Sequence, residues 1–345
     1  MRMQKAMLAM SGGVDSSVAA HLILQQGFKC VGATMLLCGD AGVKDAESVA
    51  NRLGIPFFVF DHRGDFQNLV VEDFINCYEQ GGTPNPCVTC NKKIKFDVLL
   101  RRALAEGCDF LATGHYARIV PENGRFLLYK AKDLSKDQSY FLACLNQYQL
   151  SHTLFPLGEL EKEQVRQIAE NLALVNAKKK DSQDICFIPD GDYKAFMEHY
   201  TGKCYPQGDY LDENGNVVGR HQGAVGYTIG QRKGLGIALG QPVYVSQKDM
   251  SANTVTVGPE ESLYKSALIA DNWNFIPFDT LEVPIQVKAR VRYRHTEQPA
   301  TVYPMEGGLA RVEFAEPQRA ITTGQAVVLY DGDMVVGSGR IIQVL

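Results

Sequence analysis

The chain has 345 residues, 45% of them hydrophobic, which is enough for two or three domains with apolar cores. Its formal net charge of −4 argues against indiscriminate nucleic-acid binding, so any RNA partner would be met by local basic patches. The apolar runs are shorter than a membrane span, and a strand begins too early for a cleaved signal peptide. We therefore expect a cytoplasmic protein with no membrane partner.

The cysteines divide into two groups. There are nine in all, an odd count that, without secretion signals, argues against a structural disulfide framework. Most of them, such as Cys30, Cys108 and Cys144, lie in apolar segments typical of small buried side chains. Cys87, Cys90 and Cys186 are the exceptions and are candidates for chemistry.

A glycine turn near the N-terminus predicts an anion site. Residues 7–10 form a short apolar strand, residues 11–17 read SGGVDSS, and an apolar helical face follows, ending near Gly27. Glycines in such a turn allow close backbone approach, and N–H groups at a helix N-terminus favour a phosphate. No Gly-Lys-Ser/Thr follows, so this is not a Walker loop. The alternative is a glycine-rich turn before an ordinary helix.

The next segments alternate between strand and helix. We expect strands at residues 30–37 and 56–60, and helices at about 45–53 and 65–80, which indicates a parallel sheet with crossover helices. Ligands of such sheets lie beyond the carboxyl ends of the strands. Met35 is therefore expected to line an adenine pocket, although its spacing fits an ordinary core methionine equally well.

Residues 81–96, GGTPNPCVTCNKKIKF, predict a reactive thiol. The prolines and glycines favour a loop as far as Val88, with a helix from about Asn91 to residue 106. Cys90 would then lie at a helix N-terminus beside Lys92 and Lys93. Such an environment lowers a thiol pKa.

Three later segments add candidates. A strand at 108–113 should place Gly114 at the ligand edge of the sheet, and a helix with outward polar residues should begin near residue 136. After a helix at about 161–172, three lysines precede Cys186 on a loop. A lysine run usually marks a solvated face.

From about residue 202 the pattern changes to short strands typical of small β-barrels. We therefore expect an α/β domain at 1–200, a central β domain at 201–262, and a C-terminal β-barrel at 263–345. Lys288, Arg290, Arg292 and Arg294 alternate with apolar residues, so on one strand they would face one way, roughly 6.6 Å apart. A row of four cations predicts an anionic partner such as a polynucleotide backbone. The alternative is that these cations form a solvated strand face without a partner.

Taken together, these segments resemble the tRNA-specific 2-thiouridylases, a family of PP-loop ATP pyrophosphatases, over nearly the whole chain. The resemblance is carried by SGGVDSS at 11–17, GGTPNPCVTCNKKIKF at 81–96, ATGHYARI at 112–119, KDQSYFL at 136–142, DSQDICFI at 181–188, YTIGQRKGLGI at 227–237 and VRYRH at 291–295.

The resemblance implies a parallel, doubly wound PP-loop sheet domain followed by two small β-barrel-like domains. It also implies ATP- and Mg²⁺-dependent adenylation of the C2 oxygen of the wobble uridine, in tRNAs such as those for Lys, Glu and Gln. Sulfur would then arrive from a persulfide on Cys186, loaded by a cysteine desulfurase or sulfur-relay protein, with Cys90 as nucleophile.

ATP contacts are implied for Ala9, Met10, Ser11, Gly12, Gly13, Val14, Asp15, Ser16, Met35 and Gly114. Target-base contacts are implied for Asn85, Pro86 and Cys87, and tRNA contacts for Lys136, Asp137, Gln138, Arg292 and Tyr293.

Two departures and several alternatives stay open. Many family members have Asp where Cys87 stands, and the segment between residues 37 and 45 is short. Cys87, Cys90 and Cys186 could instead hold three irons of a four-iron cluster, and a zinc site would need a fourth ligand. We rank persulfide chemistry first. The rival functions are a PP-loop amidotransferase or synthetase, and a non-catalytic RNA-binding protein with a structural nucleotide.

Overall fold

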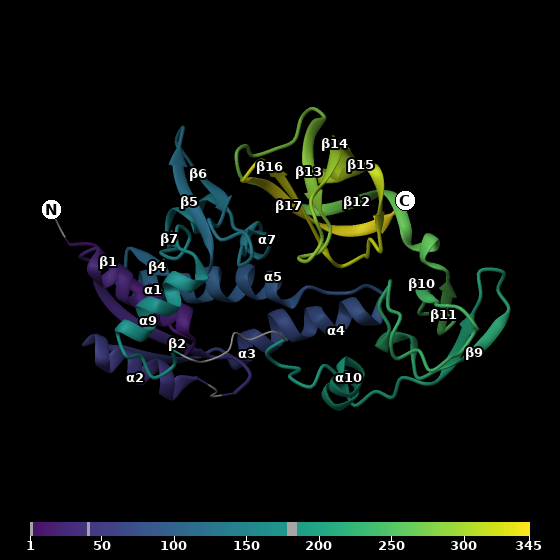
Figure 1. The fold of residues 1–345 in the computed structure, drawn as a ribbon, viewed down its shortest axis with the longest axis horizontal. Coiled ribbons are helices and arrows are strands. Elements are labelled where there is room, and N and C mark those ends of the chain that lie inside the picture. The colour runs from purple at the N-terminus through teal and green to yellow at the C-terminus, as the bar shows by residue number, and fades with distance from the viewer. Residues whose placement is uncertain (1–2, 40–41, 178–184) are drawn as a thin grey trace.

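The computed structural model describes residues 3–39, 42–177 and 185–345, and these form three β-sheets. Figure 1 shows the N-terminal parallel sheet and the central β-sheet at opposite ends of the molecule. Long helices run between these ends, and the C-terminal barrel lies over the helices. The arrangement confirms the expected order of an α/β domain followed by β domains.

The N-terminal sheet is parallel throughout, with strand order β3-β2-β1-β4-β7. Its strands are β1 (Lys5–Ala9), β2 (Lys29–Leu36), β3 (Phe57–Asp61), β4 (Phe110–Ala112) and β7 (Thr153–Leu154). Along β1, Ala6 and Leu8 belong to one apolar core and Met7 to another. Both faces of the sheet are therefore covered at β1, as a continuous apolar strand requires, whereas Phe58 and Val59 of the edge strand β3 are exposed.

Helices lie between the strands of this sheet and after its last strand. They are α1 (Val14–Gln25), α2 (Val43–Leu53), α3 (Arg63–Phe66), α4 (Glu72–Glu79), α5 (Pro86–Cys90), α6 (Leu100–Ala105), α7 (Ser139–Leu142), α8 (Gln147–Ser151), α9 (Lys162–Asn171) and α10 (Tyr193–Thr201). Two π-helical stretches, Gln67–Val71 and Asn91–Leu99, join α3 to α4 and α5 to α6. The result is two long helices, at residues 63–79 and 86–105.

The C-terminal barrel is closed by pairing of its first and last strands. The six strands, in the order β12-β15-β14-β13-β16-β17, are β12 (Tyr264–Phe275), β15 (Ala310–Arg319), β14 (Gln298–Pro304), β13 (Ile285–Arg290), β16 (Ala326–Asp331) and β17 (Met334–Val344). Pairing of β12 with β17 completes the ring. The central sheet has the order β10-β11-β8-β9, with β8 (Gly208–Leu211), β9 (Val217–His221), β10 (Tyr244–Asp249) and β11 (Thr254–Gly258).

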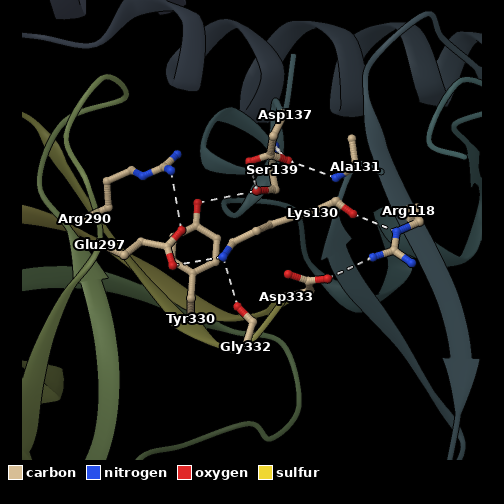
Figure 2. A network of polar contacts seen from close by, with 10 residues as sticks. All are labelled: Arg118, Lys130, Ala131, Asp137, Ser139, Arg290, Glu297, Tyr330, Gly332 and Asp333. Carbon is tan, nitrogen blue, oxygen red and sulfur yellow. Dashed lines mark hydrogen bonds and ion pairs between the residues drawn. The ribbon is translucent and has the colours of Figure 1, made fainter. Parts of the chain in front are cut away.

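A hairpin from the N-terminal domain joins the barrel, which the sequence reading did not anticipate. Its strands are β5 (Ala117–Glu122) and β6 (Arg125–Lys130), and β6 reaches β17 where Tyr129 is the partner of Met334. Figure 2 shows the ion pairs beside this junction. Glu297 accepts from Lys130 at 2.9 Å and lies 3.4 Å from Arg290, while the Tyr330 ring lies under both cations.

The barrel also shares an apolar core with the N-terminal domain. Ile276, Val328 and Val335 of the barrel are buried in the same cluster as Leu99 and Leu128. Within the described ranges, no helix combines the length and apolar character that crossing a bilayer requires.

Candidate active site

The predicted anion loop lies between β1 and α1, at the carboxyl edge of the sheet. Gly13 is the N-cap of α1, and in the described part of the chain no side chain caps this helix end. The Ser16 hydroxyl donates to the Gly13 carbonyl at 3.0 Å and accepts from the Ser11 N–H at 3.2 Å. The N–H groups of the first helical turn, with two serine hydroxyls nearby, form a site suited to a pyrophosphate.

Two close approaches explain glycines of this site. At Gly12, with φ +72°, an added Cβ would lie 2.4 Å from the Gly42 carbonyl oxygen. At Gly114, an added Cβ would lie 2.6 Å from the backbone nitrogen of Ser16. The loop is therefore held between the chain before α2 and the chain after β4, in contacts that only glycine allows.

Asp15, in the first turn of α1, is held by two side chains. The Lys162 ammonium lies 2.8 Å from both carboxylate oxygens, and the Tyr116 hydroxyl donates to one of them at 2.8 Å. Asn176 donates to the Gly12 carbonyl at 3.1 Å and to the Ser17 hydroxyl at 2.9 Å. The sequence reading missed Tyr116, Lys162 and Asn176, since nothing in their local sequence marks them as partners of a distant loop.

The helix that carries the cysteines begins earlier than predicted. Pro86 is its first residue, and Asn85 caps it by accepting from the Val88 N–H at 3.3 Å. Proline is well tolerated at this position because the first helical N–H has no intrahelical partner. The predicted start near Asn91 is wrong, and Cys90 lies within a continuous helix instead of at its N-terminus.

The predicted lowering of the Cys90 pKa is also wrong. Cys90 is 8% exposed, and burial raises its pKa to about 11. Lys92 and Lys93, the neighbours in sequence, are exposed, whereas Lys95 is the cation that opposes the effect of burial. The π-helical stretch that begins at Asn91 has about 4.4 residues per turn, which brings Lys95 to the face of Cys90.

Lys95 also contacts His115. Its ammonium lies 3.5 Å from Nε2 of the imidazole, and Nδ1 lies 2.7 Å from the Thr113 hydroxyl. Burial, aided by Lys95, holds the pKa of His115 well below its usual range. A neutral imidazole can accept from Lys95 at Nε2 and donate to Thr113 at Nδ1. The cation is thus fixed between the sheet edge and the thiols.

Four cysteines share this region. Cys38 and Cys186 are exposed, and the Cys38 sulfur lies 3.5 Å from the Cys186 carbonyl oxygen. Cys87 is exposed at the start of α5. Partial removal of its thiol from water raises the pKa of Cys87, and the charge of Cys186 raises it further. Across the described residues, no three His, Cys, Asp or Glu side chains are arranged to hold a metal ion. Residues 178–184, with the lysine run, lie outside the described ranges.

The predicted RNA contacts at residues 136–138 have protein partners. Asp137 is 4% exposed, and its carboxylate accepts from the Ala131 N–H at 3.1 Å and the Ser139 hydroxyl at 2.8 Å. Burial raises its pKa. The side-chain amide oxygen of Gln138, Oε1, accepts from the Tyr116 N–H at 3.0 Å. The expectation that these polar residues point outward is wrong for Asp137, whose hydrogen bonds order the loop before α7.

The predicted four-cation stripe is wrong. Strand β13 ends at Arg290, which pairs with Glu297, so Arg292 and Arg294 lie in the turn beyond it. Arg292 donates to the Ile229 carbonyl at 3.0 Å and the Thr322 hydroxyl at 2.7 Å. The Tyr293 ring packs on Phe141, with centroids 4.4 Å apart. Both residues therefore connect domains. Their contact with tRNA stays a prediction, as does the ATP contact of half-buried Met35.

The barrel supports the loop before α5. Gln325 donates to the Thr83 and Pro84 carbonyls at 2.9 and 3.0 Å, and the Thr83 N–H donates to the Thr323 carbonyl at 2.8 Å. An added Cβ at Gly324 would lie 2.3 Å from the sulfur of Cys77. The C-terminal domain thus fixes the segment that carries Asn85, Pro86 and Cys87.

Comparisons with known proteins cover the whole chain. Three family models match in order: the tRNA methyl transferase HUP domain at residues 4–190, the tRNA methyl transferase PRC-barrel domain at 194–259, and the aminomethyltransferase beta-barrel domain at 265–341. The chain is 48% identical to the tRNA-specific 2-thiouridylase MnmA of Acetivibrio thermocellus, over 99% of this chain and 100% of that protein. It is 47% identical to the tRNA-specific 2-thiouridylase MnmA of Clostridium perfringens strain 13, over 100% of both chains. A solved 4-thiouridine synthetase–RNA complex with bound ATP has 17% identity, covers 54% of this chain and 45% of that one, and has a TM-score of 0.39.

Proposed function

This chain belongs to the tRNA-specific 2-thiouridylase family, and we propose that it replaces the C2 oxygen of a wobble uridine in tRNA by sulfur. The C2 oxygen of uridine is a poor leaving group. Transfer of AMP from ATP to that oxygen turns it into a good leaving group, which a sulfur nucleophile can then displace.

The loop at residues 11–17 supports the ATP half of this proposal. The uncapped N-terminus of α1 and the hydroxyls of Ser11 and Ser16 suit the pyrophosphate, and Gly12 and Gly114 bring the backbone close. Mg²⁺ would accompany the phosphates and neutralise their charge. Asp15 is the carboxylate of this loop, and Lys162 and Tyr116 fix its orientation.

The cysteines support the sulfur half. The terminal sulfur of a Cys186 persulfide bonds to C2, and AMP leaves with the oxygen. Cys90 thiolate then attacks the Cys186 sulfur and breaks its bond to the transferred sulfur, which keeps that electron pair as thiocarbonyl. A Cys90–Cys186 disulfide remains. Lys95 favours the Cys90 thiolate against the effect of burial.

A four-iron cluster on Cys87, Cys90 and Cys186 is the second candidate. As positioned, these residues do not fit one, since no metal-holding group of three is found in the described ranges. We therefore derive no step through a cluster. Anaerobic purification followed by iron and acid-labile sulfide analysis separates the candidates: activity without iron supports the persulfide, and activity proportional to iron supports the cluster.

The single observation that carries the proposal is that α5 carries both Cys87 and Cys90, and that Cys186, from a segment far away in the sequence, lies near enough for its charge to raise the pKa of both thiols. A PP-loop amidotransferase would need neither Cys90 nor Cys186. A nucleotide-dependent RNA-binding protein would need no leaving-group chemistry at all.

The test supplies ATP, Mg²⁺, a cysteine desulfurase with cysteine, and tRNA with a wobble uridine. We expect tRNA-dependent pyrophosphate release and 2-thiouridine in the digested RNA. Cys90→Ser and Cys186→Ser should each lower 2-thiouridine formation by roughly 100-fold or more, because each removes a reacting sulfur.

Cys204→Ser is the matched control and should retain activity, since Cys204 is an exposed thiol of the central region. Full activity of both Cys90→Ser and Cys186→Ser would exclude thiolation through these thiols and favour the amidotransferase. Absence of pyrophosphate release with every tRNA tested would favour the non-catalytic protein.

A further inference from the structure

Cys38 is a thiol at the site that the proposed reaction does not use. It follows β2 at the carboxyl edge of the sheet, where ligands of this fold lie. The Cys38 thiol donates to the Cys186 carbonyl oxygen at 3.5 Å, and the nearby Cys186 side chain lowers the pKa of Cys38. Cys38 and Cys186 are both exposed, whereas Cys90 is buried.

We propose that Cys38 is a resolving thiol, which attacks the disulfide left after sulfur transfer and moves it from Cys90 to Cys38. The inference rests on the persulfide form of the proposed function. In this step the Cys38 thiolate forms a bond to the Cys186 sulfur as the Cys90–Cys186 bond breaks. The electron pair and then a proton go to Cys90. One disulfide replaces another, so no oxidant or reductant is consumed.

The local chemistry suits each partner in this exchange. Cys38 is exposed and its sulfur lies 3.5 Å from the Cys186 carbonyl oxygen, so this thiol is beside the residue whose disulfide sulfur it attacks. The leaving Cys90 thiolate is stabilised by Lys95. A thiolate already in contact with its target sulfur reacts faster than external thiols, because no second molecule has to be brought into place.

The exchange would have two consequences for turnover. Cys90 returns to the reduced state inside the protein, ready for the next uridine. The remaining disulfide joins two exposed residues, Cys38 and Cys186, where an external dithiol can reduce it.

The test is a single turnover without added thiol. Enzyme loaded with persulfide by a cysteine desulfurase is freed of cysteine, mixed anaerobically with ATP, Mg²⁺ and wobble-uridine tRNA, and quenched in acid. Alkylation and non-reducing peptide mapping then locate the disulfide. We expect 2-thiouridine, a Cys38–Cys186 disulfide and alkylated Cys90.

The Cys38→Ser variant separates this role from a structural one. It should give the same single-turnover yield of 2-thiouridine but stop at a Cys90–Cys186 disulfide. Under multiple turnover with limiting dithiol its rate should fall by about tenfold, because the dithiol must then reduce a disulfide that includes the buried Cys90 sulfur instead of one between two exposed residues. Cys204→Ser should behave as the unaltered protein in both measurements.

The outcomes distinguish the two proposals. Normal 2-thiouridine with a Cys90–Cys186 disulfide and alkylated Cys38 in the unaltered protein would overturn the resolving role and leave the proposed function intact. Normal 2-thiouridine with every cysteine alkylated would overturn the resolving role and the persulfide route together. No 2-thiouridine at all would overturn the proposed function itself.

Discussion

Single residues set the shape of the nucleotide loop, and Gly12 gives the sharpest test. Gly12→Ala would place a methyl group 2.4 Å from the Gly42 carbonyl at a φ of +72°, so the loop must move. We expect kcat/KM for ATP to fall by about tenfold or more, because small misplacements of a binding group are costly in rate. Pyrophosphate release at varied ATP concentration measures this.

Gly27→Ala is the matched control for that variant. Gly27 also has a positive φ, +86°, but a Cβ there would meet nothing within 4 Å. The Gly27→Ala variant should have the same backbone strain as Gly12→Ala, about 1 kcal/mol, without moving the loop at residues 11–17. Equal losses of ATP use in both variants would show that strain alone, and not displacement of the loop, explains the effect.

The thiols of the site should respond differently to pH. Burial raises the pKa of Cys90 to about 11, while the nearby Cys186 side chain lowers that of Cys38 to about 7. Between about pH 7 and pH 9 the Cys90 thiolate fraction should thus rise about tenfold per pH unit, whereas that of Cys38 levels off. Iodoacetamide alkylation of each peptide, followed by mass spectrometry, measures this. A Cys90 rate that levels off below pH 8 would contradict the effect of burial.

At the scale of elements, the helix at residues 86–105 depends on its cap. Asn85→Ala removes the acceptor for the Val88 N–H and should lower the free energy of unfolding by about 1 kcal/mol. Asn85→Asp keeps a capping oxygen and should lose much less. Urea denaturation compares them. An equal loss in the two variants would mean that the cap does not stabilise the helix.

Local patterns predicted the elements well where burial alone shapes them. The strand at residues 30–37 and the helix that ends before Gly27 are mostly buried, and their apolar content is enough to predict them. The strand at 56–60 was also predicted from its apolar residues, although it is an edge strand in which Phe58 and Val59 are exposed. The helix at Pro86 was missed because proline reads as a breaker, although it is favourable at a first helical position. Its π-helical turn, which carries Lys95 to Cys90, has no signature in apolar spacing.

Long-range contacts explain the other errors. Alternation from Lys288 to Arg294 predicted one strand, but Arg292 finds the Ile229 carbonyl and Thr322 hydroxyl, and these partners lie far away in the sequence. Asp137 likewise finds backbone donors that no local pattern reveals. The resemblance supplied the roles of Cys90 and Cys186, whereas Cys38 emerges only from the folded chain.

At the scale of the whole molecule, Glu297 joins the hairpin to the barrel (Figure 2). The side chains of Glu297, Lys130 and Arg290 are 12%, 11% and 17% exposed. Glu297→Ala would leave two mostly buried cations without their shared carboxylate. We expect the free energy of unfolding to fall by about 3 kcal/mol, measured by chemical denaturation.

Asp279→Ala is the control for that substitution. Asp279 pairs with Arg125 at 3.0 Å, also between the hairpin and the C-terminal domain, but it is 85% exposed. Its removal should cost less than about 1 kcal/mol, as is usual for surface ion pairs. Comparable losses in the two variants would indicate that burial of Glu297 is not what makes its ion pairs strong.

The shared β6–β17 junction has a consequence for how such chains can be recombined. Because Ile276 and Val328 pack in one cluster with Leu99 and Leu128, cutting the chain before β12 would bare apolar surface on both fragments. A chimera that takes its barrel from a relative should therefore fold only if residues 117–130 come from the same relative. Two separate segments of the sequence would then have to be exchanged together.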